Sequence, residues 1–254
     1  MKTIRYHLDD NVFVVTGASR GIGFEIAKQL LEQNAKVVIC SRKKENLDRA
    51  AADLGADESR LLAHPAHVAK PEEVDSLFDA ASEKFGTVHA LVNNVGMNIA
   101  TGAADADPGL WQKIIDTNLS GSYLCARKAV GIMKENAGGI IVNISSIAGT
   151  KATPAMGIYG IAKAGIEMMT KVLACELAPF SVRVNAVAPC MVKTDFSSVF
   201  WSDDNLHGEI VKTIPMGRIA EPSDVVDPVL FLCSGGAKFI TGQTLAVDGG
   251  ALAC

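Results

Sequence analysis

The feature that most constrains the fold is a short apolar strand that runs directly into a glycine-rich turn and a helix. Residues 12–15, Val-Phe-Val-Val, form a run typical of a strand buried on both faces of a parallel sheet. The turn Thr-Gly-Ala-Ser-Arg-Gly-Ile-Gly follows at residues 16–23, and a helical pattern extends over residues 24–33. Glycines at such a corner let backbone N–H groups and the helix N-terminus approach a pyrophosphate. We therefore predict a dinucleotide site here, with simple close packing of strand and helix as the alternative.

Strands and helices alternate along the rest of the chain. Further buried strands are predicted at residues 36–40, 61–63, 88–92, 138–144, 182–187 and 243–247. Helical patterns lie at residues 43–54, 71–85, 108–134, 164–174 and 222–233. This alternation is typical of an α/β fold with a doubly wound sheet, and the 254 residues fit one domain over residues 1–254.

Composition narrows the class of protein. A net charge of −4 gives no sign of a polyanionic partner, so we expect no nucleic-acid binding. No apolar run reaches the roughly 20 residues of a membrane span, and residues 1–7 lack the apolar core of a signal peptide. The six scattered cysteines indicate mostly buried, reduced thiols in a cytoplasmic protein. The five histidines lack metal-ligand spacing, so no metal site is expected.

The residues after the second predicted strand bear on the choice of nucleotide. An NAD-selective site usually has an acidic residue there, which binds the ribose 2′-OH. This chain has Ser41 and Arg42 instead, and Arg20 lies in the glycine turn. Guanidinium groups bind phosphate through paired hydrogen bonds, so we predict NADP(H) rather than NAD(H). The alternative is that both arginines are ordinary surface charges.

A possible acid–base site begins where the strand at residues 138–144 ends. Ser145 and Ser146 follow that strand, and Tyr159 and Lys163 lie one helical turn apart farther along the chain. A hydroxyl at a strand end can then face a phenol and an ammonium group, which suits proton transfer to a carbonyl oxygen. A nearby cation favours tyrosinate, so we expect the pKa of Tyr159 to lie below its usual value of about 10. The alternative is that Tyr159 only packs and Lys163 is solvated.

Three other segments carry candidate site residues. Asn93-Asn94-Val95-Gly96 follows a predicted strand, where asparagine side chains can bridge strand ends and touch a ligand, or simply form a turn. Asn118 lies within a helical pattern that it suits poorly, which predicts a local kink with its side chain bonded to backbone or water. Residues 195–217 lack a strong period and predict a long functional loop.

The aromatic residues of that predicted loop have two interpretations. They can wall an apolar substrate pocket, or they can pack against the rest of the domain. The residues concerned are Phe196, Phe200 and Trp201, with Met216 nearby.

In this order and spacing, the motifs resemble the short-chain dehydrogenase/reductase family over essentially the whole chain. The motifs that carry the resemblance are TGASRGIG from Thr16, NNVG from Asn93, Asn118, Ser146 with Tyr159 and Lys163, and the segment from Pro189 to Thr194. The resemblance implies a single Rossmann-type doubly wound domain with a seven-stranded parallel sheet, usually assembled as a homotetramer or homodimer. It also implies a substrate region at about residues 190–217.

The resemblance further implies roles for the acid–base residues. Tyr159 would be the general acid in reduction and the base in oxidation, and Ser146 would hold the substrate carbonyl, with Ser145 as the fallback. Lys163 would bind the nicotinamide ribose and lower the pKa of Tyr159. Asn118 would anchor a water molecule in a proton relay.

The same resemblance implies the contacts of the cofactor and the substrate. The expected cofactor contacts are Gly17, Ser19, Arg20, Gly21, Ile22, Gly23, Ser41, Arg42, His67, Val68, Asn94, Val95, Gly96, Tyr159, Lys163, Pro189, Val192 and Thr194. The expected substrate contacts are Ser146, Tyr159, Cys190, Phe196, Phe200 and Trp201.

Three positions depart from the family pattern. Val95 stands where alanine is common, and His67 stands where an aspartate often meets the adenine amino group. Cys190 replaces the glycine that usually follows Pro189. Its side chain would narrow the pocket or present a reactive thiol, but we favour the interpretation that it is a tolerated small residue.

Two details are similar to the tetrameric NADPH-dependent carbonyl reductases of the family, namely His67-Val68 and the segment at residues 193–201. We therefore predict an NADPH-dependent reductase of ketones or aldehydes, and the segment at residues 196–201 mildly favours a bulky apolar substrate. The alternatives are a 3-oxoacyl-ACP or -CoA reductase, an NAD-dependent secondary alcohol dehydrogenase, and a non-catalytic nucleotide-binding protein. A pure binder, like a Rossmann-like methyltransferase, would not need Tyr159 and Lys163. The last residues, Leu-Ala-Cys, differ from a peroxisomal Ser-Lys-Leu-like tag, so we do not expect that location.

Overall fold

Seven strands form one parallel sheet in the computed structural model, which describes residues 4–136 and 138–254. The order across the sheet is β3-β2-β1-β4-β5-β6-β7, and every neighbouring pair is parallel. The strands are β1 (Val12–Thr16), β2 (Lys36–Ser41), β3 (Leu61–Pro65), β4 (Ala90–Asn93), β5 (Gly139–Ile144), β6 (Val182–Pro189) and β7 (Thr244–Val247). The predicted seven-stranded parallel sheet is confirmed.

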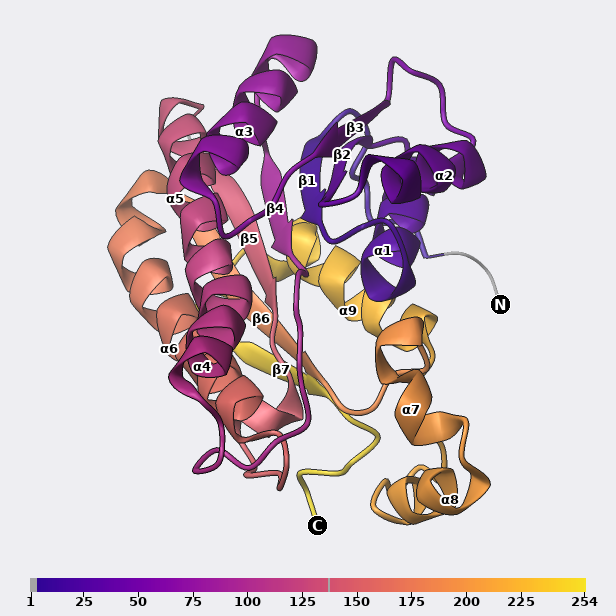
Figure 1. The fold of residues 1–254 in the computed structure, drawn as a ribbon. Helices are drawn as coiled ribbons and strands as arrows, with labels where there is room; N and C mark the ends of the chain where they lie inside the picture. Colours follow the sequence, from indigo (N-terminus) through magenta and orange to yellow (C-terminus); the bar gives the residue numbers. More distant parts are fainter. Residues whose placement is uncertain (1–3, 137) are drawn as a thin grey trace.

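Helices cover both faces of this sheet, as Figure 1 shows. Successive residues of a strand point to opposite faces, so Phe13 and Val15 enter one apolar core while Val14 enters the other. The first core is closed by α1 (Gly21–Glu32), α2 (Lys44–Leu54) and α9 (Pro222–Cys233). The second is closed by α3 (Pro71–Phe85), α5 (Gly121–Glu135) and α6 (Gly157–Leu177). This layering confirms the doubly wound Rossmann-type fold.

The direction of winding reverses beside β1, because β2 pairs with one of its edges and β4 with the other. Ligands of open α/β sheets bind at such a reversal, outside the carboxyl ends of the strands. The glycine turn after β1 and the two asparagines at the end of β4 therefore meet at the same edge. Within residues 4–136 and 138–254, no helix is both long and apolar enough to cross a membrane.

The helical pattern at residues 108–134 is divided by one widened turn. Helix α4 (Pro108–Ile115) passes into a π-helical turn (Asp116–Ser120) before α5 begins. Asn118 lies in this turn, and its Nδ2 donates to the carbonyl oxygen of Ile114 at 2.8 Å. The expected irregularity at Asn118 is thus present, with its side chain bonded to backbone.

The prediction of a loop at residues 195–217 was wrong in part. The segment contains a 3₁₀ turn (Asp195–Ser197), α7 (Ser198–Trp201) and α8 (Asp204–Lys212), which appear in orange in Figure 1. Asp203 caps α8 by accepting hydrogen bonds from the backbone N–H groups of Asn205 and Leu206. No residue of α8 is fully buried, and its apolar residues Ile210 and Val211 pack partly buried against the cluster around Ile214.

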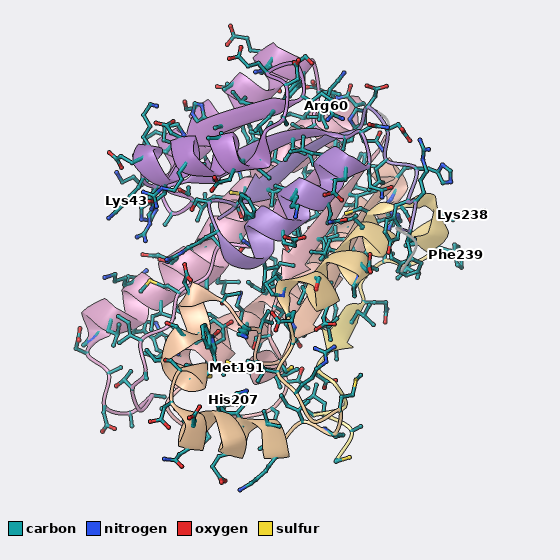
Figure 2. The ribbon with its side chains drawn as sticks, turned by 90° about the vertical axis from the view of Figure 1, so that its right-hand side faces the viewer. Lys43, Arg60, Met191, His207, Lys238 and Phe239 are labelled. Carbon is teal, nitrogen blue, oxygen red and sulfur yellow. The ribbon has the colours of Figure 1, made fainter. Side chains whose placement is uncertain are left out.

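The two ends of the 195–217 segment meet in a narrow main-chain bridge. The N–H of Lys193 donates to the carbonyl oxygen of Ala220 at 2.8 Å, and the N–H of Ala220 donates to that of Met191 at 2.9 Å. A small apolar cluster of Ile214, Ile219 and Ala251 packs the segment against the rest of the domain, where it also meets Ile147 and Cys190. Met191 and His207 mark this part of the molecule in Figure 2.

His89 joins the beginnings of β1 and β4. The N–H of Val12 donates to Nδ1 of His89 at 2.9 Å, and the N–H of His89 donates to the carbonyl oxygen of Val12 at 2.9 Å. An Nδ1 atom that accepts a hydrogen bond carries no proton, so this bridge requires the neutral imidazole. Desolvation, with a smaller contribution from the charge of Lys36, lowers the pKa of His89 below 6.5.

We expect acid to weaken the fold through this histidine. Below about pH 6.5 the unfolded chain binds a proton at His89 that the folded chain resists, so the free energy of unfolding falls as the pH drops. Urea denaturation of the wild type at pH 7.5 and pH 5.5 measures the change.

The matched variants are His89→Gln and His64→Gln, because burial also lowers the pKa of His64. His89→Gln should reduce the difference in stability between the two pH values. If both variants keep the full wild-type difference, neither imidazole is its source.

Candidate active site

The glycine turn after β1 forms a cradle that side chains would fill. Gly17 has a φ of +65°, a conformation that favours glycine. A Cβ atom on Gly23 would lie 2.7 Å from the carbonyl oxygen of Gly17 and would also collide with the Nδ2 atom of Asn94. A larger residue would therefore displace the backbone of the turn. The turn fits the pyrophosphate of a dinucleotide, which needs close approach to main-chain N–H groups.

Helix α1 begins inside this cradle at Gly21. Arg20 precedes it as the N-cap residue, and its side chain forms no capping hydrogen bond. The first N–H groups of α1 thus receive no hydrogen bond from the side chain of Arg20. That side chain also carries no negative charge to offset the positive end of the helix dipole. Across the cradle lies Thr194, whose Cγ2 would be 3.4 Å from a Cβ atom on Gly21. Ser19 and Ile22 are half-buried in the same turn.

Asn94 and Thr16 fasten the end of β4 to the end of β1. Nδ2 of Asn94 donates to the carbonyl oxygens of Thr16 at 2.9 Å and Gly17 at 3.2 Å. In return, Oγ1 of Thr16 accepts hydrogen bonds from the N–H groups of Asn94 at 2.9 Å and Val95 at 3.3 Å. Bridging of strand ends by asparagine is what the sequence predicts. Thr16 was missed as a site residue, although it begins the glycine motif.

The residues expected near the adenosine end lie on two neighbouring strand ends. Ser41 ends β2, and Arg42 is exposed beside it. Nδ1 of His67 accepts a hydrogen bond from the N–H of Ala69 at 3.2 Å, so its ring is bonded to its own loop. Val68 is buried, and a Cβ atom on Gly121 would collide with it at 2.6 Å.

Arg20 already has an acidic neighbour. Its guanidinium lies 3.6 Å from Oδ2 of Asp195, at the start of the 195–217 segment. Both side chains are largely exposed, so this ion pair stabilises the fold little. Of the two arginines predicted to bind a phosphate, Arg20 is therefore the one that already forms an ion pair.

Tyr159 and Lys163 project from α6 toward the end of β5. Lys163 is only 2% exposed, and its Nζ donates to the carbonyl oxygen of Ile144 at 2.7 Å. Ser146 forms a hydrogen bond with Tyr159, whereas the buried hydroxyl of Ser145 donates to Oε1 of Glu167 at 3.0 Å. The structure therefore brings Ser146, and not Ser145, to the phenol.

The expected direction of the Tyr159 pKa was wrong for this form of the protein. Burial raises the pKa of Tyr159 to about 12, and the hydrogen bond with Ser146 opposes this only in part. Lys163 does not reverse the change, because its Nζ bonds to Ile144 and lies 5.5 Å from the centre of the Tyr159 ring. Burial also lowers the pKa of Lys163 to about 8. The sequence showed the neighbouring cation but not the extent of desolvation.

Asn118 lies close to Lys163 across Gly96. A Cβ atom on Gly96 would be 3.2 Å from Oδ1 of Asn118 and 3.7 Å from Nζ of Lys163. The side-chain amide of Asn118 is bonded to the main chain, since Nδ2 donates to the carbonyl oxygens of Met97 and Ile114 and Oδ1 accepts from the N–H of Met97. Oδ1 and the main-chain carbonyl oxygen of Asn118, which accepts from Ser122 Oγ, each keep one lone pair with which to bind a water molecule.

The predicted substrate residues divide into two groups. Phe196 lies beside the phenol, with its ring centre 6.5 Å from that of Tyr159. Trp201 instead packs within the 195–217 segment, and its Nε1 donates to the carbonyl oxygen of Thr194 at 3.1 Å. Its structural role agrees with the packing alternative. Phe200 is half-buried on α7.

Cys190 follows Pro189 at the end of β6 and is half-buried. Burial raises the pKa of its thiol, and the negative charge of Asp248 adds to the effect. A thiol with a raised pKa forms little thiolate at neutral pH, which disfavours the reactive-thiol interpretation. Val192 is buried two residues farther on, beside the cradle-facing Thr194.

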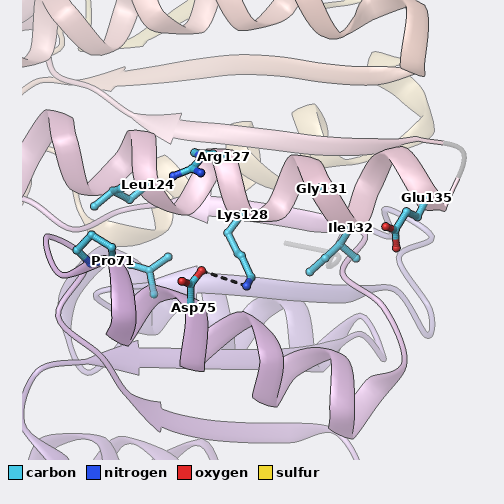
Figure 3. A pocket seen from close by; sticks show the side chains of 9 residues that line it. Pro71, Asp75, Leu124, Arg127, Lys128, Gly131, Ile132 and Glu135 are labelled. Atoms are coloured by element: carbon cyan, nitrogen blue, oxygen red, sulfur yellow. Dashed lines mark ion pairs between the residues drawn. The ribbon is translucent and has the colours of Figure 1, made fainter.

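A separate hollow of about 410 Å³ lies between α3 and α5, away from all these residues (Figure 3). Its wall includes Lys128, which forms ion pairs with Asp75 at 3.0 Å and Asp79 at 3.1 Å. None of the predicted site residues lines this hollow. The candidate site is therefore the carboxyl edge of the sheet.

Comparison with known proteins agrees with this geometry. The family model described as Enoyl-(Acyl carrier protein) reductase matches residues 17–251. Dehydrogenase/reductase SDR family member 4 of Bos taurus is 38% identical over 98% of this chain and 89% of its own length. The 3alpha-hydroxysteroid dehydrogenase of Mediterraneibacter gnavus is 35% identical over 96% of this chain and 98% of its own.

A solved structure shows the same similarity. A putative short-chain alcohol dehydrogenase from Sinorhizobium meliloti superimposes with a TM-score of 0.92 at 36% identity, covering 98% of this chain and 99% of that one. The matches extend over the glycine cradle, the acid–base residues and the 195–217 segment. The chain therefore belongs to the short-chain dehydrogenase/reductase family and is an oxidoreductase that acts on CH–OH or C=O groups.

Proposed function

We propose that this enzyme is an NADPH-dependent carbonyl reductase. The observation that carries the proposal is the meeting of Ser146, Tyr159 and Lys163 at the sheet edge that also holds the glycine cradle. A reduced nicotinamide, when bound, supplies a hydride to the carbonyl carbon. The remaining work is to hold the carbonyl, deliver a proton to its oxygen and stabilise the negative charge that develops there.

Each of the three side chains has one part in this work. The hydroxyl of Ser146 donates a hydrogen bond to the carbonyl oxygen and holds it against Tyr159. The phenol of Tyr159 is protonated at neutral pH, because its pKa is about 12, and is therefore ready to act as the acid in reduction. Lys163 stabilises the phenolate that remains and meets the ribose of the cofactor. Asn118 supports a water relay through its carbonyl oxygens.

The cofactor would lie across the carboxyl edge. Its pyrophosphate would meet the turn at residues 17–23, and a 2′-phosphate would meet Arg42 with Ser41 and Arg20. The residues proposed for the adenosine end and the adjoining ribose are His67, Val68, Asn94, Val95 and Gly96. The residues proposed for the nicotinamide end are Pro189, Val192 and Thr194.

We further propose that residues 190–217 select the substrate, with preference for a bulky apolar ketone. Phe196 supports this, because its ring lies beside the phenol while 48% of the side chain remains exposed to meet an apolar group. A relative named as a hydroxysteroid dehydrogenase is consistent with a substrate of that kind. Cys190 and Phe200 would complete the wall.

The first test is turnover of a carbonyl panel with NADPH and with NADH. The panel contains alicyclic ketones, diketones, aldehydes and a 3-oxoacyl thioester, and the loss of cofactor absorbance measures the rate. NADPH should support faster reduction of alicyclic ketones than of the thioester. The proposal would be contradicted if no carbonyl is reduced with NADPH or with NADH. It would also be contradicted if the enzyme reduces the thioester faster than the alicyclic ketones.

Tyr159→Phe should remove nearly all turnover but leave cofactor binding intact. The substitution deletes the acidic O–H and keeps the ring, so kcat should fall by about 10²-fold or more. Fluorescence titration with NADPH should give an unchanged Kd. A variant that keeps wild-type kcat would exclude Tyr159 as the acid.

Arg42→Ala should weaken NADPH binding selectively. Loss of a charge-assisted hydrogen bond to the 2′-phosphate should raise the KM for NADPH by roughly 10- to 100-fold and leave that for NADH unchanged. Arg127→Ala is the matched control, since Arg127 is exposed beside the hollow between α3 and α5. Equal changes in the KM for the two cofactors would show that Arg42 does not read the 2′-phosphate.

A further inference from the structure

The carboxylate of Glu167 forms hydrogen bonds with both ends of the turn that carries Ser146. It lies on α6 one helical turn beyond Lys163, and its carboxylate reaches the chain that leaves β5. Oε1 accepts a hydrogen bond from the hydroxyl of Ser145 at 3.0 Å, and Oε2 accepts one from the hydroxyl of Thr150 at 3.3 Å. One carboxylate thus binds the residue before Ser146 and a residue four positions after it.

The turn between these two residues lies directly on the helix. It includes a short 3₁₀ turn (Ile147–Gly149), and a Cβ atom on Gly149 would be 2.8 Å from Oε1 of Glu167. A Cβ atom on Gly160 would be 2.7 Å from the carbonyl oxygen of Ala148. Gly149 in the turn and Gly160 on α6 have no side chains, so the turn and the helix can approach this closely. Any displacement of the turn from the helix therefore changes the distance between Ser146 and Tyr159.

The hydroxyl of Ser145 lies within reach of two acceptors, and the carboxylate of Glu167 forms the stronger hydrogen bond. Ser145 is 2% exposed and has a single proton to donate. The main-chain oxygen of Lys163 lies at 3.3 Å, whereas the carboxylate lies at 3.0 Å and forms the stronger, charge-assisted bond. Removing the carboxylate would leave a buried hydroxyl with the longer bond and free Thr150.

We propose that Glu167 is a positioning residue that fixes the hydroxyl of Ser146 opposite Tyr159 by binding Ser145 and Thr150. The inference rests on the proposed function, in which Ser146 holds the carbonyl that Tyr159 protonates. Glu167 touches neither the cradle nor the phenol in the described contacts, so its effect should fall on the chemical step and not on cofactor binding.

The experiment compares three variants on α6. Glu167→Ala deletes both acceptors, Glu167→Gln keeps one amide oxygen for Ser145, and Glu176→Ala removes an exposed glutamate from the same helix. Glu167→Ala should lower kcat for ketone reduction roughly 10- to 100-fold, the loss typical of slight misplacement, while the Kd for NADPH stays within about twofold. Glu167→Gln should recover most of kcat, and Glu176→Ala should match the wild type.

Two further measurements separate positioning from general stability. Ser145→Ala should lower kcat on its own, and Ser145→Ala combined with Glu167→Ala should lose no more than Glu167→Ala alone, because the bond that Ser145 supplies is already lost in that variant. Hydrogen exchange should speed up in Glu167→Ala at residues 145–150 and remain unchanged at residues 17–23. This second readout needs no turnover.

The outcomes distinguish the inference from the function on which it rests. If the wild type reduces no carbonyl but exchange at residues 145–150 still depends on Glu167, the proposed function fails and the contact stands. If the wild type is active and Glu167→Ala keeps both its kcat and its exchange rates, the inference is overturned. It is also overturned if Glu167→Ala weakens NADPH binding as much as kcat. If Glu167→Ala does not fold, Glu167→Gln and Ser145→Ala decide, and wild-type kcat in Ser145→Ala overturns the inference.

Discussion

The hydrogen bond from Lys163 to Ile144 is the interaction on which the rest of the site depends. An ammonium group that is 2% exposed must be satisfied by protein, and here the last carbonyl oxygen of β5 receives it at 2.7 Å. This bond fixes α6 to the end of one central strand. Tyr159 lies one helical turn before Lys163 and Glu167 one turn after it, so the same contact places the phenol on one side and the carboxylate on the other. One helix–strand contact therefore helps to position both Tyr159 and Glu167.

The side of the edge proposed to bind the cofactor is built on the same principle, with polar groups joining strand ends that the sheet brings together. Thr16 and Asn94 exchange hydrogen bonds across β1 and β4, and the buried amide of Asn93 donates to Oδ1 of Asn143 on β5 at 2.9 Å. Neighbouring strand ends are thus joined by side chains as well as by the sheet itself. Such a frame costs little reorganisation when a ligand arrives, because its dipoles are already oriented.

Much of this molecule can be predicted from its sequence, and the exceptions have physical reasons. The strands are readable because both faces are buried, which leaves continuous apolar runs such as residues 12–15. Ser146, Tyr159 and Lys163 are readable because their spacing reflects one strand end and one helical turn. Helix α8 is harder to predict, because it is short and none of its residues is fully buried. The pKa of Tyr159 depends on desolvation, and the partnership of Glu167 with Ser145 joins residues 22 apart in sequence, so neither leaves a local pattern.

The bridge between Met191, Lys193 and Ala220 brings together the two ends of the segment that connects β6 to α9. What lies beyond this bridge can change in length or shape without altering the strands, since closing a longer loop there costs only about 0.6 kcal/mol for each doubling of its length. The fold therefore keeps the acid–base residues and the 195–217 segment on separate parts of the chain. Under the proposed function, the acid–base residues lie at the carboxyl edge of the sheet, and substitutions confined to the 195–217 segment would change the substrate without changing that edge.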